Sequence, residues 1–287
     1  MPLTPYACSN CGFWQRYFAP PPDCPVCTDP RNDLPEDGWK FLAVPEVTAM
    51  LTGHWRRLPR DMVAFTTSPP LGLNGTGWLL LHEDGNIAFE AAPFYTEPML
   101  QEIERLGGIR VLAASHVHGY GALWQLQDRF HPEILAIQKD DLRMTKAFGV
   151  TWPYDETLEL RPGMVLHHVA GHYEGQAVLH DAARRTLFCG DAFKVDQDAA
   201  GNNLAVSTHK AFHKSIPLTA GEVRRYREVV AQLEFDAVCT PFEYAPGVTT
   251  AMALAVLDDQ LRGPPGVRHL PISQLISPPI NPMGSPS

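Results

Sequence analysis

The chain has 287 residues, 45% of them apolar, and a formal net charge of −9 at neutral pH. This length is enough for one sizeable hydrophobic core, and the apolar runs are shorter than the ~20 residues that a membrane-spanning helix needs. The negative charge argues against nucleic acid as a partner, because phosphate contacts require a basic face. The first residues lack the basic and apolar segments of a signal peptide. We therefore expect a cytoplasmic protein with neither a nucleic-acid nor a membrane partner; a homodimer is left open.

Four cysteines near the N-terminus form two tight pairs. They are Cys8-x-x-Cys11 and Cys24-x-x-Cys27, with twelve residues between the pairs. This spacing is typical of a tetrahedral structural metal site, and the surrounding residues also resemble the knuckles of rubredoxin. Zinc is the expected ion, although iron accepts the same four thiolates and would indicate electron transfer. Cys189 and Cys239 lie in apolar runs and are expected to be core thiols.

Proline density marks the boundaries of the chain's three parts. Of 27 prolines, nine fall in residues 1–45 and seven in residues 263–287. Because proline blocks helices and central strands, we expect a small cysteine knuckle over 1–45, a main domain over 46–262 and a largely disordered tail over 263–287. Residues 270–276 of the tail could dock on the main domain, with disorder beyond about 278.

The main domain alternates short apolar runs with amphipathic helices. Residues 77–81 and 87–90 predict a hairpin around Asp84-Gly85, followed by a helix from Thr96 to residue 106 and a strand over 109–114. Residues 158–170 and 177–189 predict two further antiparallel pairs. A capping box at Thr219 and Glu222 opens a helix to about residue 233, and another helix runs from 249 or 250 to 262. This order predicts a layered α/β domain.

Metal-ligand side chains follow three of these strand-like runs. His116 and His118 come directly after residues 109–114, Gly171-His172 closes the run over 165–170, and Gly190-Asp191 closes the run over 186–189. Neighbouring strand ends deliver residues to one rim of a sheet, so we expect His116, His118, His172 and Asp191 to hold one metal ion.

Residues 61–261 resemble the metallo-β-lactamase superfamily, whose members have an αββα sandwich. The resemblance is carried by Ser115-His116-Val117-His118, Gly171-His172 and Gly190-Asp191, in the family's order. Where the family has Asp-His after the first pair, this chain has Tyr120-Gly121, and where the family has a late histidine, residues 239–242 contain none. The missing residues are the family's ligands for a second ion, so a single ion is expected unless other side chains replace them: Tyr120, Glu174, His209 or His213. Within the superfamily, the chain resembles an uncharacterised group that carries an N-terminal knuckle of this kind.

The resemblance implies hydrolysis of an ester, thioester, lactone or phosphoester by zinc-activated water, with a small molecule as substrate. Asp191 could leave the zinc and act as a base. An alternative is an Fe²⁺ oxygenase of the persulfide-dioxygenase type, with His116, His172 and Asp191 as ligands. A third is a degenerate protein whose metal site is structural or empty.

A few other residues carry hypotheses of their own. By resemblance, Glu90 stands where an acidic residue hydrogen-bonds a metal-bound histidine. Tyr120 could assist catalysis or pack in the core at a helix start. Glu174, next to Tyr173, could line the pocket and take part in catalysis. His209 and His213 have the i, i+4 spacing of one helix face and are candidate ligands or substrate contacts. Lys194 could meet an anionic substrate or be solvated.

Overall fold

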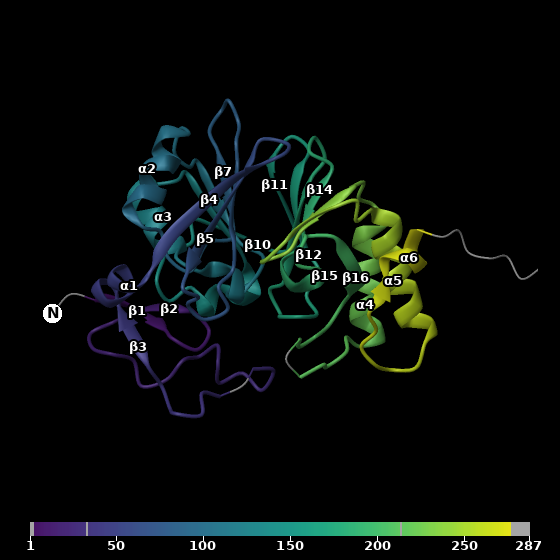
Figure 1. Cartoon of the computed structure of the whole chain (residues 1–287), viewed down its shortest axis with the longest axis horizontal. Coiled ribbons are helices and arrows are strands. Elements are labelled where there is room, and N and C mark those ends of the chain that lie inside the picture. The colour runs from purple at the N-terminus through teal and green to yellow at the C-terminus, as the bar shows by residue number, and fades with distance from the viewer. Residues whose placement is uncertain (1–2, 33, 213, 277–287) are drawn as a thin grey trace, which may run out of the picture.

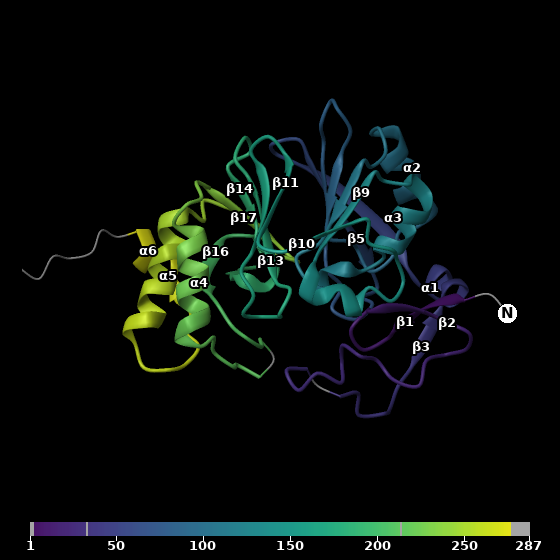
Figure 2. The ribbon, with the colours of Figure 1, turned by 180° about the vertical axis from the view of Figure 1, so that it is seen from behind.

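The computed structural model describes residues 3–32, 34–212 and 214–276. Two β-sheets face each other in the middle of the molecule, and helices cover the outer face of each sheet (Figures 1 and 2). This is the predicted αββα sandwich, with a small N-terminal module attached beside the first sheet. In the ranges described, the structure contains no helix that is both long and apolar enough to cross a membrane.

The first sheet has seven strands in the order β10-β9-β8-β7-β6-β5-β4. These are β4 (Thr52–Leu58), β5 (Met62–Ser68), β6 (Gly77–Leu80), β7 (Ile87–Phe89), β8 (Val111–Ala113), β9 (Ile134–Gln138) and β10 (Trp152–Tyr154). β6 and β7 form the predicted antiparallel hairpin, whereas β7, β8 and β9 run parallel. Helices α2 (Glu97–Arg105) and α3 (Leu123–Phe130) cover the outer face (Figure 1). Parallel strands end at the same edge, so the chain leaves β8 at one rim of the sandwich.

The second sheet has six strands in the order β11-β12-β13-β14-β17-β18. These are β11 (Thr157–Arg161), β12 (Met164–His168), β13 (Ala177–Asp181), β14 (Thr186–Phe188), β17 (Ala237–Cys239) and β18 (Tyr244–Pro246). Helices α4 (Ala220–Val230) and α5 (Thr250–Arg262) cover it on the outside (Figure 1). The predicted capping box is present at α4: the Thr219 amide donates to Glu222 Oε2 over 2.7 Å, and the Glu222 amide donates to Thr219 Oγ1 over 3.3 Å.

Aromatic side chains fill the space between the two sheets. The buried ring of Phe188 in the second sheet lies 6.3 Å from that of Trp78 and 5.8 Å from that of Phe89 in the first, both at edge-to-face angles. Such rings bury large apolar areas and prefer this geometry. Their packing holds the two sheets in one relative position, which aligns the strand ends that carry the metal-ligand residues.

The N-terminal module shares its core with the first sheet. Its strands β1 (Thr4–Cys8), β2 (Trp14–Tyr17) and β3 (Phe41–Ala43) form an antiparallel sheet, and α1 (Val44–Met50) follows. The buried Trp14 ring lies 6.0 Å from Phe94 and 5.2 Å from Trp124, and its Nε1 donates to the Pro93 carbonyl over 2.8 Å. The boundary that we predicted between residues 45 and 46 falls inside α1.

The C-terminal segment packs on the second half of the sandwich. β15 (Lys194–Gln197), β16 (Asn203–Ser207) and β19 (Leu270–Pro271) form a small sheet, and the short helix α6 (Ile272–Ile276) follows. Leu270 pairs with Val206, and Ile272 and Leu275 pack against the core around α4 and α5. Residues 270–276 therefore dock on the main domain, the arrangement that we left open for this part of the tail. The disorder expected beyond residue 278 falls on residues outside the described ranges.

Candidate metal centre

The four predicted metal ligands come together from three strand ends. His116 and His118 follow β8 at the start of the 3₁₀ helix η1 (Val117–Tyr120). His172 lies in the turn after β12, and Asp191 lies in the 3₁₀ helix η3 (Gly190–Ala192) after β14. Each ligand therefore sits just beyond a buried strand, on the rim where the two sheets meet.

Glycines precede His172 and Asp191 because the chain turns sharply there. Gly171 and Gly190 have φ angles of 83° and 50°, in the left-handed region that side chains with a Cβ disfavour. A Cβ at Gly190 would lie 2.3 Å from Ser115 Oγ, and one at Gly171 would lie 2.8 Å from the Tyr226 ring. The two Gly-containing motifs are therefore geometric requirements of the site.

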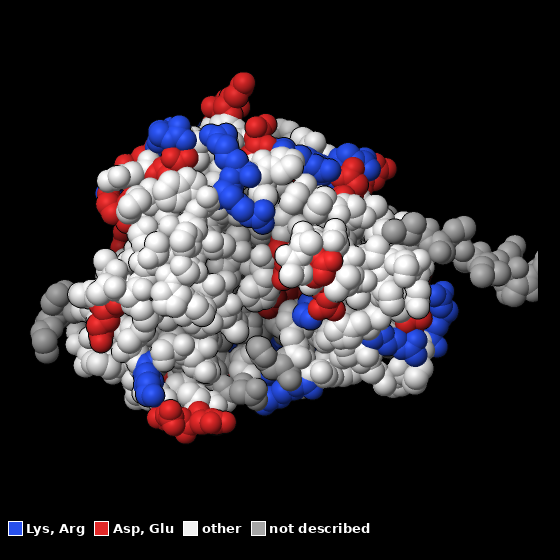
Figure 3. All heavy atoms as spheres, viewed as in Figure 1, with Lys and Arg blue, Asp and Glu red and all other residues white. Residues whose placement is uncertain are grey.

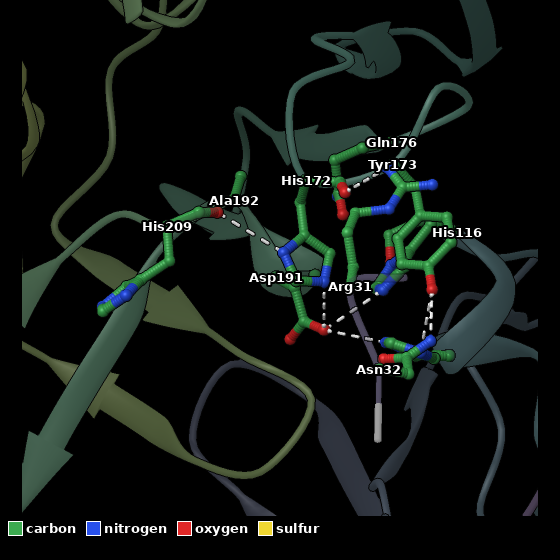
Figure 4. A network of polar contacts seen from close by, with 12 residues as sticks. Arg31, Asn32, His116, His172, Tyr173, Gln176, Asp191, Ala192 and His209 are labelled. Carbon is green, nitrogen blue, oxygen red and sulfur yellow. Dashed lines mark hydrogen bonds and ion pairs between the residues drawn. The ribbon is translucent and has the colours of Figure 1, made fainter. Parts of the chain in front are cut away.

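The four ligand atoms lie close enough together to share one metal ion. Asp191 Oδ2 lies 3.1 Å from His116 Nε2, 3.5 Å from His118 Nδ1 and 3.2 Å from His172 Nε2 (Figure 4). Bonds of ~2.0 Å to a tetrahedral zinc ion place ligand atoms ~3.3 Å apart. The three distances from Asp191 are close to this value, and all four ligand atoms lie within 4.8 Å of one another, so the four side chains can hold one divalent ion.

The protonation states also suit a metal. Burial lowers the pKa of His116 to about 3, so its imidazole is neutral. Burial opposes the charge of Asp191, but the charge of His172 and the close contacts of the three histidine rings hold the pKa of its carboxyl well below the usual value. Neutral imidazole and ionised carboxylate are the ligand forms that bind metals. In addition, Asp191 Oδ1 is buried and has no hydrogen-bond partner among the described residues, which is costly unless another group satisfies it.

Ser115 links Glu90 to the first ligand. The buried Ser115 hydroxyl donates to Glu90 Oε1 and lies 2.8 Å from His116 Nδ1. The Ser115 hydroxyl proton takes part in the hydrogen bond to Glu90, so Ser115 Oγ can only accept a hydrogen bond from His116. The ring proton of His116 is therefore on Nδ1, and the lone pair of Nε2 faces Asp191. Burial raises the pKa of Glu90 to about 8. Glu90 was predicted to contact a ligand histidine directly; the structure places Ser115 between them.

At two positions where the family has ligands for a second metal ion, this chain has residues that cannot bind a metal through their side chains. Gly121 has φ 38°, and a Cβ there would lie 2.3 Å from the Ala91 carbonyl oxygen, so the backbone leaves no room for a histidine. Near the position of the late histidine, Phe242 lines the pocket beside the metal site. These two residues favour a single ion.

Tyr120 belongs to the core. Its ring lies 5.3 Å from that of Phe148, and its hydroxyl donates to Asp141 Oδ2 over 3.4 Å. Burial raises its pKa well above the usual value. Of the two roles that we considered for Tyr120, the structure has the packed aromatic, and the catalytic role is not supported.

The helix predicted around His209 is wrong. β16 ends at Ser207, and Ala211 pairs with Ile216 in an isolated bridge. The His209 ring points away from Asp191 (Figure 4), with Nε2 2.9 Å from Ser207 Oγ, whereas its backbone carbonyl accepts from His172 Nδ1 over 3.4 Å. His209 thus orients a ligand through its backbone instead of acting as a ligand. His213 lies outside the described residues.

Glu174 faces away from the metal-site pocket. Its carboxylate lies 3.0 Å from Arg31 Nη2 and lines a separate cavity together with Asp141. The catalytic role suggested for Glu174 therefore lacks geometric support. Arg31 and Asn32, by contrast, reach the site from the N-terminal module, and sequence reasoning missed them. The single signal available was that they follow the fourth cysteine closely.

A pocket of about 480 Å³ opens beside the metal ligands. Its polar residues are His118, His172, Asp191, Arg31, Asn32 and Lys194, and its apolar walls include Leu73, Tyr173, Ala211, Phe212 and Phe242. Lys194 pairs with Asp196 and still borders the pocket, which supports the substrate-facing alternative for this lysine. The pocket is large enough for a small organic molecule.

The four predicted cysteines also form a cluster. Cys8 Sγ lies 3.9 Å from Cys27 Sγ, and Cys11 Sγ lies 3.6 Å from Cys24 Sγ. Metal–sulfur bonds of ~2.3 Å in a tetrahedron place sulfur atoms ~3.8 Å apart, so the geometry fits a metal bound by four thiolates. Cys189 and Cys239 are buried separately in the core, as predicted.

The fold and the motif define a class of protein. Residues 78–231 match the model of the metallo-beta-lactamase superfamily, and the chain belongs to this superfamily. It is 27% identical to the uncharacterized protein YmaE of Bacillus subtilis (strain 168) over 245 residues, which are 83% of this chain and 88% of that protein.

Solved structures share the fold at low identity. The metallo-beta-lactamase FIM-1 from Pseudomonas aeruginosa in its mono-zinc form is 11% identical, with a TM-score of 0.52, over 74% of this chain and 97% of that one. A metallo-beta-lactamase from Hirschia baltica is 14% identical, with a TM-score of 0.53, over 74% of this chain and 99% of that one. About a quarter of the chain is not covered by these structural matches.

Proposed function

We propose that the protein is a hydrolase that depends on one divalent metal ion held by His116, His118, His172 and Asp191. The observation that carries this proposal is the convergence of these four ligand atoms, all within 4.8 Å of one another, next to a pocket of about 480 Å³. The expected substrates are esters, thioesters, lactones or phosphoesters. Zinc is the ion we propose at this site and in the four-cysteine cluster.

Asp191 has two roles open to it. A divalent ion supplies Lewis-acid polarisation of a carbonyl or phosphoryl oxygen and lowers the pKa of water to about 7. A zinc ion held by all four side chains would be closed, so Asp191 would serve turnover as a base and not as a fourth ligand. Its Oδ1 is buried without a hydrogen-bond partner in the part of the chain that the structure describes, and it can then accept the proton of the attacking water.

The pocket walls suit a substrate with an apolar group. Leu73, Phe212 and Phe242 can contact an acyl or aryl group, while the metal ligands border the same space. Lys194 adds a positive charge for an acidic substituent, although Asp196 neutralises part of it. An apolar ester or lactone with a carboxylate is therefore our preferred substrate class.

We also propose a cytoplasmic protein that acts on small molecules without a nucleic-acid partner. None of the six cysteines forms a disulfide, as is usual in a reducing compartment. On the face shown in Figure 3, lysine and arginine side chains lie in small groups, most of them near aspartate and glutamate, which differs from a basic nucleic-acid surface.

Metal analysis of anaerobically purified protein tests the proposal. We compare the wild type with the double variants His116→Ala/Asp191→Ala and Cys8→Ser/Cys11→Ser, and assay all three with a panel of esters, thioesters, lactones and phosphoesters. We expect two zinc ions in the wild type, loss of one ion in each variant, and no hydrolysis by the His/Asp variant.

Three results would overturn the proposal. An unchanged metal content in the His/Asp variant would show that these residues do not bind the metal, which contradicts the proposed catalytic site. Iron at this site together with oxygen uptake on glutathione persulfide would favour the oxygenase alternative. Full metal content without hydrolysis of any substrate in the panel would favour the degenerate, non-catalytic alternative.

A further inference from the structure

The segment that follows the fourth cysteine is folded onto the cysteine turn. The Thr28 amide donates to the Cys24 carbonyl over 3.0 Å, and the Asp29 amide donates to the Val26 carbonyl over 3.1 Å. Asn32 Nδ2 donates to the same Val26 carbonyl over 2.8 Å. Because Val26 lies between Cys24 and Cys27, the position of Asn32 depends on the shape of the four-cysteine site.

Asp29 holds Arg31 in a fixed direction. Arg31 Nε donates to Asp29 Oδ1 over 2.8 Å and Nη2 donates to Asp29 Oδ2 over 2.7 Å, which is a bidentate pair. The Arg31 side chain is 13% exposed. A charge-assisted pair with this little exposure fixes the guanidinium plane more firmly than a single surface contact does.

The guanidinium group of Arg31 binds the loop that contains His172. Arg31 Nη1 donates to the His172 carbonyl over 2.9 Å, and Nη2 lies 3.0 Å from Glu174 Oε2. Its Cζ lies 4.0 Å from the centre of the Tyr173 ring, at cation–π distance. Three consecutive residues of the second sheet's loop are thus bound by one side chain of the N-terminal module.

Asn32 completes the contact through Tyr173. Asn32 Nδ2 donates to the Tyr173 hydroxyl over 2.7 Å (Figure 4). The same hydroxyl lies 3.5 Å from His118 Nε2. The buried Tyr173 ring lies 5.0 Å from the His118 ring, 5.4 Å from that of His172 and 5.5 Å from that of His116. The Tyr173 ring therefore contacts all three ligand imidazoles, and Arg31 and Asn32 of the N-terminal module hold it in place.

The module also reaches the opposite wall of the pocket. Lys214 Nζ donates to the Pro30 carbonyl over 3.0 Å, and Lys214 follows the segment whose Ala211 and Phe212 line the pocket. Residues 29–32 thus lie between the loop of His172 and the segment after β16.

We propose that Arg31 and Asn32 are positioning residues of the metal centre, and that the four-cysteine site controls the affinity of the His/Asp site through them. Metal bound by the cysteines fixes the 24–32 segment, which holds Tyr173 against the three imidazoles. Loss of that metal releases this support and one wall of the pocket. The proposal deepens the proposed function, but its metal-binding consequence does not depend on hydrolysis.

Zinc affinity measured separately at each site tests this coupling. We compare Arg31→Gln, Asn32→Ala and Cys8→Ser/Cys11→Ser with the control Arg16→Gln, using competition with a chromophoric chelator. Arg16 also ties the module to the main domain, through Asp128 at 2.6 Å and the Ala147 carbonyl at 2.7 Å, and is not among the residues that line the pocket. Circular dichroism and thermal unfolding establish that each variant is folded.

We expect Arg31→Gln and Asn32→Ala to keep the four-cysteine zinc and to bind zinc at the His/Asp site about 10- to 100-fold more weakly, the usual effect of losing an outer contact to a metal ligand. The cysteine variant should show the same weakening. Arg16→Gln should stay within about twofold of the wild type at both sites.

A spectroscopic readout separates positioning from general stability. Cobalt added to protein that retains zinc in the cysteine cluster enters the His/Asp site, and its visible absorption reports the ligand geometry. The bands should shift in Arg31→Gln and Asn32→Ala and stay unchanged in Arg16→Gln. Wild-type affinity and spectra in the first two variants, or equal losses in Arg16→Gln, would overturn the coupling. Absence of hydrolysis in all proteins would overturn the proposed function and leave this result intact.

Discussion

Ser115 Oγ lies 2.8 Å from Nδ1 of His116, and its hydroxyl donates a hydrogen bond to Glu90 Oε1. This arrangement fixes both the ring orientation of His116 and the nitrogen that carries its proton. The metal-facing nitrogen is therefore set by a residue that would not itself touch the metal.

Ser115→Ala should weaken metal binding at the His/Asp site by about 10- to 100-fold, because His116 loses its hydrogen-bond acceptor and its fixed tautomer. Zinc titration against a chelator measures the change. Ser115→Thr keeps the hydroxyl and is the matched variant, provided that its extra methyl group is tolerated near Gly190. Equal affinity in Ser115→Ala and the wild type would refute the role of this contact.

Gly121→Ala should destabilise the fold by about 2 kcal/mol or more, because φ is 38° and the new Cβ would lie 2.3 Å from the Ala91 carbonyl oxygen. Gly149→Ala is the control: its position is exposed, nothing lies within 4 Å of the new Cβ, and we expect a change within about 0.5 kcal/mol. Urea unfolding of the zinc-loaded proteins measures both. If Gly121→Ala proved as stable as the control, steric exclusion of a ligand at this position would be wrong.

Asp141→Asn should change how stability depends on pH. Burial raises the pKa of Asp141 from 3.8 to about 6, against the hydrogen bonds from the Gly175 and Val117 amides and the Tyr120 hydroxyl. The unfolded chain releases this proton near pH 3.8 and the folded chain releases it near pH 6, so the contribution of Asp141 is most favourable below pH 3.8 and is lost as the pH rises to 6.

The wild type should accordingly lose stability relative to Asp141→Asn between about pH 4 and pH 6, by something on the order of 1–3 kcal/mol, and the difference should be constant above that window. Urea unfolding at half-unit steps of pH gives the two curves. A difference that does not vary with pH would contradict the shifted pKa.

Phe242→Ala should raise KM for apolar substrates by about tenfold with a smaller effect on kcat, because the ring contributes contact area to the pocket and lies apart from the metal ligands. Trp152→Ala removes an aromatic side chain that is 52% exposed and should leave both constants unchanged. The initial rates of the best substrate from the ester panel provide the measurement. A drop in kcat alone would place Phe242 in the chemistry and not in substrate binding.

The sequence determined the fold and the two ligand sets because their signals are local. Helix boundaries follow from residues such as Thr219 and Glu222, whose hydrogen bonds span only three positions. The ligands His116, His172 and Asp191 each follow an apolar run. Each run forms a strand, and these strands end at the same rim of the sandwich. The four cysteines likewise carry their own spacing.

The tertiary structure decided the contacts between distant segments. Arg31 meets Tyr173, 142 positions later, because Tyr173 extends from the loop between β12 and β13 into the apolar cluster that the N-terminal module shares with the first sheet. The i, i+4 spacing of His209 indicated a helix, yet pairing of β16 with β15 and β19 keeps the preceding chain extended and turns the imidazole away. Local patterns select an element and its ends, whereas the packing of two sheets and a module selects which side chains face the metal site.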